Sequence, residues 1–190
     1  MKNIILFGKP GAGKGTQAAL LRDTFQLVHI STGDLFRYNI SNNTSLGALA
    51  KSYMDKGDLV ADEVTIKMLE AEVDANPNVG GFIFDGFPRT AAQAEALDVF
   101  LGGKNMSIRA TIALEVDEEV LVSRLLNRGK DSGRSDDQDE DKIRNRFAEY
   151  NKKTAPLIDY YKKQNKFYSI GGEGTVAEIS EQLTSLLHSL

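Results

Sequence analysis

The chain has 190 residues, of which 41% are hydrophobic, so it is long enough to form one domain with a sizeable core. Its net charge of −4 at pH 7 argues against nucleic acid as a partner, because proteins that bind polyanions usually carry a basic excess. It contains no cysteine, which excludes disulfides, thiolate metal sites and cysteine nucleophiles, and its first apolar run (Ile4 to Phe7) is too short for a signal peptide or a membrane span.

Apolar runs with little polar alternation predict five buried parallel strands, separated by stretches with helical spacing. In chain order, the expected strands are Asn3 to Gly8, Leu27 to Ser31, Phe82 to Asp85, Ala110 to Val116 and Lys166 to Ile170. The expected helices are Lys14 to Phe25, Gly33 to Asn39, Ser45 to Lys56, Asp62 to Ala75, Thr90 to Leu101, Glu118 to Arg128, Glu140 to Lys163 and Thr175 to Leu190. Alternating strands and helices predict an α/β fold whose parallel sheet is covered on both faces.

Two segments interrupt this alternation. Residues from about Gly33 to Leu59 hold two helical patterns with no strand between them, and the stretch from Gly129 to Asp139 is polar and lacks apolar periodicity. We expect both to be inserts at the carboxyl edge of the sheet, where open α/β sheets bind ligands. Inserts of this kind are suited to act as mobile covers over a site.

The sequence GKPGAGKGTQ, from Gly8 to Gln17, joins the first expected strand to the first expected helix. Gly8, Gly13 and Lys14 match the phosphate-loop pattern G-x-x-x-x-G-K-[ST], but Gly15 occupies the Ser/Thr position and Thr16 follows one residue late. Glycines allow backbone N–H groups to converge on an anion, and the helix N-terminus adds a partial positive charge. The pattern therefore predicts a nucleotide site in which Lys14 reaches the β- and γ-phosphates.

A second motif, FIFDGFPRT, follows another expected strand, from Phe82 to Thr90. Asp85 ends that strand, where its carboxylate is placed to hold Mg²⁺ through water. Arg89 follows a Gly–Pro turn, and a guanidinium at the sheet edge suits bidentate recognition of phosphate. The guanine-reading pattern N-K-x-D is absent, which argues against a GTPase.

Further arginines lie on segments that the pattern places near the sheet edge, although an arginine taken singly is more often a solvated surface residue. Arg124 and Arg128 are four residues apart on one helix face, whereas Arg144 and Arg146 point about 160° apart, so at most one of the latter pair faces the same site well. The full set is Arg37, Arg124, Arg128, Arg134, Arg144 and Arg146.

Few side chains are available as general bases. His29 lies in a strand pattern and is expected to be structural, and His188 is near the C-terminus and is expected to fray. Phosphoryl transfer to an acceptor that is already an anion fits this inventory, because it needs no general base. Catalysis is then positioning plus charge neutralisation.

The motifs resemble, in order and over essentially the whole chain, those of the nucleoside monophosphate kinases, and among them the adenylate kinases. The matching segments are GKPGAGKGTQ, STGDLFR, KGDLV, FDGFPRT followed by Gln93, RLLNRG, SGRSDD, RNRF and GGEGT. The resemblance implies a phosphate-loop three-layer fold with a five-stranded parallel sheet, formed by a core (1–30, 61–126 and 138–190), an AMP-binding helical insert (31–60) and a short lid (127–137). It also implies reversible transfer from Mg·ATP to AMP to give two ADP, a reaction of adenine nucleotide homeostasis. Adenylate kinases characteristically have G-K-G-T in the loop and hold Mg²⁺ mainly through phosphates and water, which accounts for Gly15.

The resemblance also assigns roles to single residues. Those implied for ATP are Gly11, Ala12, Gly13, Lys14, Gly15, Thr16, Arg128 and, near the adenine, Gly174. Those implied for AMP are Thr32, Arg37, Asp58, Leu59, Val60, Gly86, Phe87, Pro88, Arg89, Gln93, Arg134 and Arg146, with Gln93 reading the adenine edge. The catalytic set implied is Lys14, Arg89, Arg124, Arg128, Arg134 and Arg146, which leaves Arg144 as the solvated arginine.

The lid of about ten residues, without cysteine, resembles short-lid forms that carry no structural zinc and are often monomeric. We therefore expect a cytoplasmic monomer with Mg²⁺ as the cofactor of ATP, with ATP, AMP and ADP as partners, and with neither nucleic acid nor membrane. Two alternatives stay open. UMP/CMP kinases share the loop and DGFPR but typically have alanine at the position of Thr32 and asparagine at that of Thr90. A non-catalytic nucleotide-binding protein on the same fold would be expected to lose Lys14, Arg89 or the lid arginines.

Overall fold

The computed structural model describes residues 1–190 and confirms an α/β fold built on a five-stranded, all-parallel sheet. The strands lie side by side in the order β2-β3-β1-β4-β5. In chain order their bounds are β1 (Asn3–Phe7), β2 (Val28–Ser31), β3 (Phe82–Asp85), β4 (Ile108–Glu115) and β5 (Phe167–Gly171). All five predicted strands are therefore present.

Helices cover both faces of this sheet, as the sequence predicted. The α-helices are α1 (Lys14–Phe25), α2 (Thr32–Ser41), α3 (Ser45–Met54), α4 (Asp62–Asp74), α5 (Ala91–Gly103), α6 (Glu118–Ser132), α7 (Glu140–Glu149), α8 (Leu157–Lys162) and α9 (Val176–Ser189). Two short turns of other helical types are η1, a 3-10 helix (Ser135–Asp137), and η2, a π-helix (Tyr150–Thr154). No helix is both long and apolar enough to cross a membrane.

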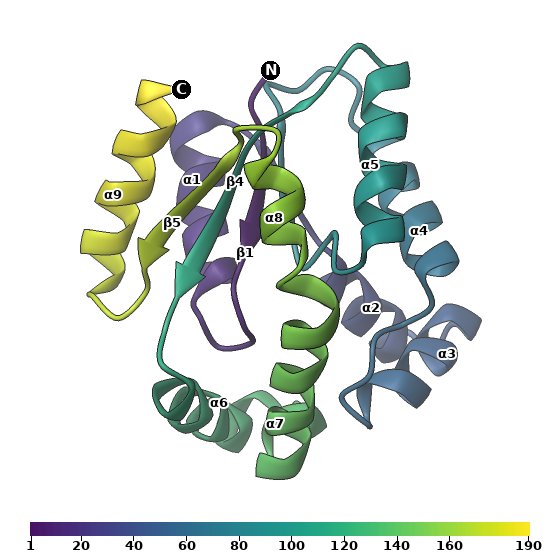
Figure 1. Cartoon of the computed structure of the whole chain (residues 1–190). Helices are drawn as coiled ribbons and strands as arrows, with labels where there is room; N and C mark the ends of the chain where they lie inside the picture. Colours follow the sequence, from purple (N-terminus) through teal and green to yellow (C-terminus); the bar gives the residue numbers. More distant parts are fainter.

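Alternate side chains of β1 belong to two separate hydrophobic cores. Ile4 and Leu6 pack with residues of α1 and α9, whereas Ile5 and Phe7 pack with residues of α4, α5 and α8. In Figure 1, α1 and α9 lie on one side of the central strands and α4 and α5 on the other. This two-sided burial explains the continuous apolar runs in the strand sequences.

The carboxyl ends of the strands point toward the part of the molecule where α2, α3, α6 and α7 gather (Figure 1). Helices α2 and α3 form a small core of their own around Phe36, Ala50 and Val60, separate from the two sheet cores. The segment with two helical patterns is therefore an insert with its own packing, at the edge where the sequence predicted it.

The helix predicted from Glu140 to Lys163 is wrong as a single element. Helix α7 ends at Glu149, the π-helical turn η2 follows, and α8 begins only after Pro156. Proline has no backbone N–H and its ring clashes with the preceding turn, so the regular ladder cannot continue through it. The π turn directs the Thr154 hydroxyl to the carbonyl oxygen of Arg89, 2.9 Å away, which ties the helix pair to the sheet edge.

Two smaller expectations are also wrong. Helix α6 continues to Ser132, into the segment expected to be irregular, and ends where Gly133 adopts a left-handed conformation with φ of 65°. His188 lies within α9 and its ring centroid is 5.1 Å from that of Phe25, so this end of the chain is packed rather than frayed.

Candidate active site

The loop after β1 leads directly into the N-terminus of α1. Gly13 is the N-cap of α1 with φ of 92°, a left-handed conformation that side-chain-bearing residues rarely adopt. The N–H groups of the first helical turn, which have no partner within the helix, therefore face the loop. This arrangement binds anions without any specific side chain.

Lys14 is the first residue of α1, and its ammonium group packs against the carbonyl groups of the loop. The Nζ atom donates to the carbonyl oxygens of Gly8 at 2.8 Å and Lys9 at 3.2 Å. Burial lowers the pKa of Lys14 to about 8, against the attraction of Asp85 and with the added repulsion of three arginines. A bound polyanion would reverse this balance and favour the charged ammonium.

Asp85, at the end of β3, lies beside this lysine. Burial would raise the pKa of Asp85, but contact with His29 and the positive charges of Lys14 and Arg89 outweigh that effect and lower it. His29 is in β2, and its Nε2 atom is 3.5 Å from the Asp85 carboxylate. An ionised carboxylate thus faces the loop at the carboxyl edge of the sheet.

Three hydrogen bonds fix Arg89, two through its backbone and one through its guanidinium group. Its N–H donates to Gln93 Oε1 at 2.7 Å, its carbonyl accepts from Thr154, and its Nε donates to the carbonyl of Gly86 at 2.7 Å. Burial, together with repulsion from Arg146, lowers the pKa of Arg89 to about 10. The guanidinium therefore stays charged near neutral pH and is fixed in position, in a region crowded with positive charge.

Two aspartates of η1 organise the arginines of α6 and α7. Asp137, whose side chain has 0% exposure, receives a bidentate pair from Arg128, with distances of 2.6 and 3.0 Å. Arg146 Nη1 lies 2.8 Å from the same carboxylate and 3.0 Å from Asp136 Oδ2. Burial would raise the pKa of Asp137, but the two arginines lower it. One ionised carboxylate therefore sets the positions of two guanidinium groups from different helices.

Two cavities meet at this edge. The first, the loop cleft, has a volume of about 710 Å³, enough for a nucleotide with its phosphates. Its lining residues come from the loop, the end of β3 and the turn after it, α6, α7 and the residue before η1. They include Gly11, Gly13, Lys14, Gly15, Thr16, Asp85, Pro88, Arg124, Arg128 and Arg134.

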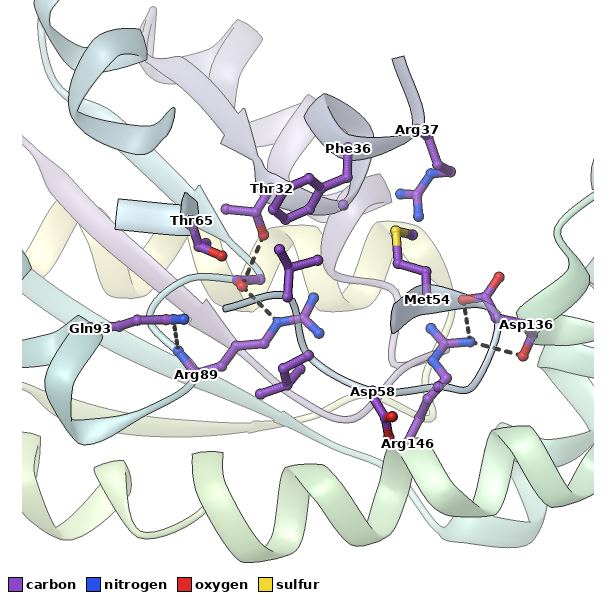
Figure 2. A pocket seen from close by; sticks show the side chains of 15 residues that line it. Thr32, Phe36, Arg37, Met54, Asp58, Thr65, Arg89, Gln93, Asp136 and Arg146 are labelled. Atoms are coloured by element: carbon purple, nitrogen blue, oxygen red, sulfur yellow. Dashed lines mark hydrogen bonds and ion pairs between the residues drawn. The ribbon is translucent and has the colours of Figure 1, made fainter. Parts of the chain in front are cut away.

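The second cavity, the insert cavity, lies between the α2–α3 insert and the β3–α5 turn, and Figure 2 shows its side chains. Apolar groups of Phe36, Met54 and Val60 line it together with polar groups of Thr65 and Gln93. The two cavities share seven lining residues: Gly33, Arg37, Gly57, Leu59, Gly86, Arg89 and Arg146. Three arginines thus lie on the wall common to both.

Most of the residues expected from the sequence line one of these cavities. Thr32, Asp58, Val60 and Gln93 line the insert cavity, and the loop glycines and lysine line the loop cleft. Arg124 also lines the loop cleft, where its Nη1 donates to the carbonyl of Gly172 at 3.2 Å.

Three expected residues do not line either cavity. The side chains of Ala12 and Phe87 are each 1% exposed and belong to the two sheet cores. Gly174 lies in the exposed turn between β5 and α9. Any part these residues play in binding would have to be through the backbone, and for all of them it stays a prediction.

Arg144 and Arg146 differ sharply in their surroundings. Arg144 is exposed and pairs with Glu119 and Glu140 on the surface, at 3.1 and 2.7 Å. Arg146, two positions later on α7, lines both cavities. The geometric expectation that only one of the pair faces the site therefore holds, and Arg146 is the one.

The segment around η1 touches the α2–α3 insert across the site. Ser135 Oγ donates to Asp55 Oδ1 at 2.9 Å, and Asn145 Nδ2 donates to the carbonyl of Lys56 at 2.9 Å. Arg134 of the same segment lies 3.7 Å from Asp34 on α2. Arg134 and Asp34 both line the loop cleft, so residues of the two segments meet at its wall.

Sequence reasoning missed the carboxylates that position the arginines. Asp136 and Asp137 were part of a recognised motif, SGRSDD, but no role was predicted for them. Asp62 was likewise unassigned, although its carboxylate accepts from both Thr90 and Gln93. The available signal was physical: buried guanidinium and amide groups need acceptors, and acidic residues on adjacent segments are the natural candidates.

The residues near Lys14 fit a magnesium ion held through water. Asp85 supplies an ionised oxygen donor, which suits Mg²⁺. A Cβ atom at Gly15 would lie 3.7 Å from Asp85 Oδ2, so the glycine leaves the space between loop and carboxylate free of a side chain. No group of three or more potential metal-ligating side chains occurs anywhere in the chain.

Comparison with known proteins identifies relatives over the full length of the chain. The family model described as adenylate kinase matches residues 6–166. An adenylate kinase from Flavobacterium psychrophilum is 63% identical over 190 residues, which cover 100% of both chains. Adenylate kinases from Flavobacterium johnsoniae and Bacteroides fragilis are 60% and 45% identical, again over 100% of both chains.

Proposed function

The chain belongs to the adenylate kinase family and catalyses reversible phosphoryl transfer from ATP to AMP, and we propose that ATP binds in the loop cleft and AMP in the insert cavity. The observation that carries this proposal is the wall of arginines shared by the two cavities. Direct transfer requires the γ-phosphate of one nucleotide to meet the phosphate of the other, and positive charge is needed most at that meeting point.

On the ATP side, we propose that the loop amides and Lys14 hold the β- and γ-phosphates. Arg124 and Arg128 flank the same cleft from α6 and add further positive charge. Adenylate kinases generally use Mg²⁺ with ATP, and Asp85 would hold this ion through water. When bound, Mg²⁺ would neutralise charge on the phosphates.

On the AMP side, we propose that Arg37 and Arg89, which both line the insert cavity, hold the α-phosphate. The apolar groups of Phe36, Met54 and Val60 provide surfaces on which a purine can pack. The buried amide of Gln93 lines the same cavity and would read the edge of the base. The acceptor is an anion that needs no deprotonation, so no residue of the cavity has to act as a general base.

During transfer, Lys14, Arg89 and Arg146 would neutralise the charge on the moving phosphoryl group. Their positions are fixed before reaction, by loop carbonyls, by backbone contacts and by the η1 aspartates respectively. Such preorganised charge costs no reorganisation at the moment of reaction.

The proposed division of the chain is a core of 1–30, 61–126 and 138–190, an AMP-binding insert of 31–60 and a lid of 127–137. The contact between Ser135 and Asp55 links the proposed lid to the proposed insert. Closure of both segments would exclude water, which otherwise competes with AMP as acceptor. The proposal also includes a cytoplasmic monomer, and the monomeric state rests on the resemblance to short-lid forms of the family.

Comparing acceptors at fixed Mg·ATP tests the assignment to AMP. Turnover with AMP should exceed turnover with UMP or CMP by far, since Thr32 and Thr90 both match the AMP-specific type of the family. Thr32 donates to the carbonyl of Gly86 beside Arg89, so it contributes to the wall of the AMP cavity. Faster turnover with a pyrimidine acceptor would overturn the assignment.

A further inference from the structure

Gln93 is held by two groups of opposite hydrogen-bonding character. Its Nε2 donates to Asp62 Oδ1 at 2.8 Å, and its Oε1 accepts from the backbone N–H of Arg89 at 2.7 Å. The other oxygen of Asp62 accepts from the Thr90 hydroxyl at 2.8 Å, so the carboxylate is itself fixed. Asp62 is the first residue of α4 and comes directly after the insert, whereas Gln93 and Thr90 belong to the start of α5.

This arrangement permits one orientation of the Gln93 amide. A carboxylate only accepts hydrogen bonds, and a backbone N–H only donates them. Turning the amide over would place its oxygen against a carboxylate oxygen and its NH₂ group against an N–H. Because Gln93 is only 2% exposed, no water could compensate for the two lost hydrogen bonds.

We propose that Asp62 is a positioning residue that sets base selectivity, because it fixes the Gln93 amide in the orientation that suits adenine and excludes 6-oxopurines. This inference rests on the proposed function, in which Gln93 faces the base of AMP. The amide keeps one N–H and one oxygen lone pair for a ligand. Adenine offers an N6 donor beside an N1 acceptor, whereas hypoxanthine offers an O6 acceptor beside an N1–H donor.

A glutamine that is free to turn over can serve either edge equally well. A fixed glutamine forms hydrogen bonds with one of these edges. It meets the other edge with donor against donor and acceptor against acceptor. Selectivity of this kind comes from the repulsive arrangement as much as from the attractive one. The residue that prevents the turn therefore contributes to selectivity without touching the nucleotide.

The alternative role for Asp62 is that of an acidic residue favoured at a helix N-terminus. Glu63 lies in the same first turn of α4, is exposed, and makes none of these contacts. Glu63→Gln therefore removes the same charge from the same helix end and serves as the matched control.

The test compares AMP with IMP, which presents the reversed edge and adds no other group. With saturating Mg·ATP, kcat/KM for each acceptor is measured for the unmodified protein and for Asp62→Asn, Glu63→Gln and Gln93→Ala. An asparagine at position 62 can donate as well as accept, so it removes the stronger, charged one of the two groups that oppose the turned amide and leaves only the Arg89 N–H. We expect Asp62→Asn to reduce the AMP/IMP ratio by about tenfold or more, the value of one hydrogen bond to a charged group. The KM for ATP should not change, and Glu63→Gln should keep the original ratio.

The outcomes separate the inference from the proposed function. If Gln93→Ala changes the AMP/IMP ratio but Asp62→Asn leaves it within twofold, Gln93 reads the base and the inference about Asp62 is wrong. Equal losses with AMP and IMP in Asp62→Asn would also overturn it, because they would show a structural role. If Gln93→Ala keeps the original ratio, the proposed reading of the base fails as well. Should Asp62→Asn not fold, Asp62→Ser, whose hydroxyl can also donate as well as accept, carries the same test.

Discussion

Replacing Arg146 with alanine is expected to slow phosphoryl transfer far more than the same change at Arg144, two positions earlier on α7. Arg146 lies on the wall shared by both cavities, 2.8 Å from Asp137 and 3.0 Å from Asp136. Arg144 is exposed and forms ion pairs only on the surface. The two substitutions remove the same group from the same helix, so they differ only in what each arginine faces.

The magnitude follows from the role proposed for each guanidinium. Loss of one preorganised charged donor to the reacting group costs about 10²–10³ in kcat, or about 3–4 kcal/mol. Loss of an exposed ion pair costs about 0–1 kcal/mol of stability and should leave kcat within roughly twofold. The buried carboxylate of Asp137 keeps its bidentate pair with Arg128 in either variant. We therefore expect the free energy of unfolding of Arg146→Ala to fall by only about 1–3 kcal/mol, the value of one charged hydrogen bond.

The assay is ADP formation at saturating Mg·ATP and AMP, with thermal unfolding measured on the same samples. Arg146→Lys is an informative third variant, because it keeps the charge but loses the geometry that pairs with two carboxylates. It should fall between the unmodified protein and Arg146→Ala. If Arg144→Ala lowered kcat as much as Arg146→Ala, or if Arg146→Ala stayed within fivefold of the unmodified protein, the role of the shared wall would be wrong.

Three further predictions concern the phosphate loop, the insert cavity and the contact between the proposed lid and the proposed insert. Because burial lowers the pKa of Lys14 to about 8 in the free protein and bound phosphate favours its charged form, ATP affinity should fall as the pH rises through about 8. Calorimetry near pH 8.5 in buffers of different ionisation enthalpy should then detect proton uptake when ATP binds. Lys14→Arg should show no such uptake. If the unmodified protein takes up no proton, the reasoning about Lys14 is wrong. Arg89→Ala should raise the KM for AMP more than the KM for ATP, and equal increases would argue against the proposed AMP cavity. Ser135→Ala removes the 2.9 Å bond to Asp55 and should raise the KM of both substrates by about fivefold, the value of one hydrogen bond; unchanged values would mean that this contact does not support closure.

The parts of the site that the sequence predicted well are those encoded locally. The loop glycines and Lys14 lie within one strand–loop–helix unit, so their spacing alone determines where the N–H groups and the ammonium point. Helix geometry likewise separated Arg144 from Arg146, since two residues on one helix differ by a fixed angle.

The parts that the sequence did not predict depend on contacts between separate segments. Asp137 is nine residues from Arg128 and nine from Arg146, and it joins them only because η1 folds back between α6 and α7. Asp62 and Gln93 are 31 residues apart, on two different helices. No periodicity in the chain signals either pairing, because each arises from packing of elements rather than from spacing within one.

The division of the expected long helix shows the same limit. The apolar pattern continues through the region of η2, so periodicity favoured one element from Glu140 to Lys163. Pro156 was a local signal for a break and could have been used. The π-helical turn before it could not have been foreseen, because its Thr154 hydroxyl bonds to Arg89, on a distant segment.

The stoichiometry of the reaction tests the central claim most directly, that a phosphoryl group passes straight from ATP to AMP in a site closed to water. ADP and inorganic phosphate are measured together, from Mg·ATP with and without AMP. The account predicts two ADP for each ATP consumed, a strict dependence on AMP and no release of phosphate above background. Phosphate release at a rate comparable to ADP formation, or ADP formation without AMP, would contradict it.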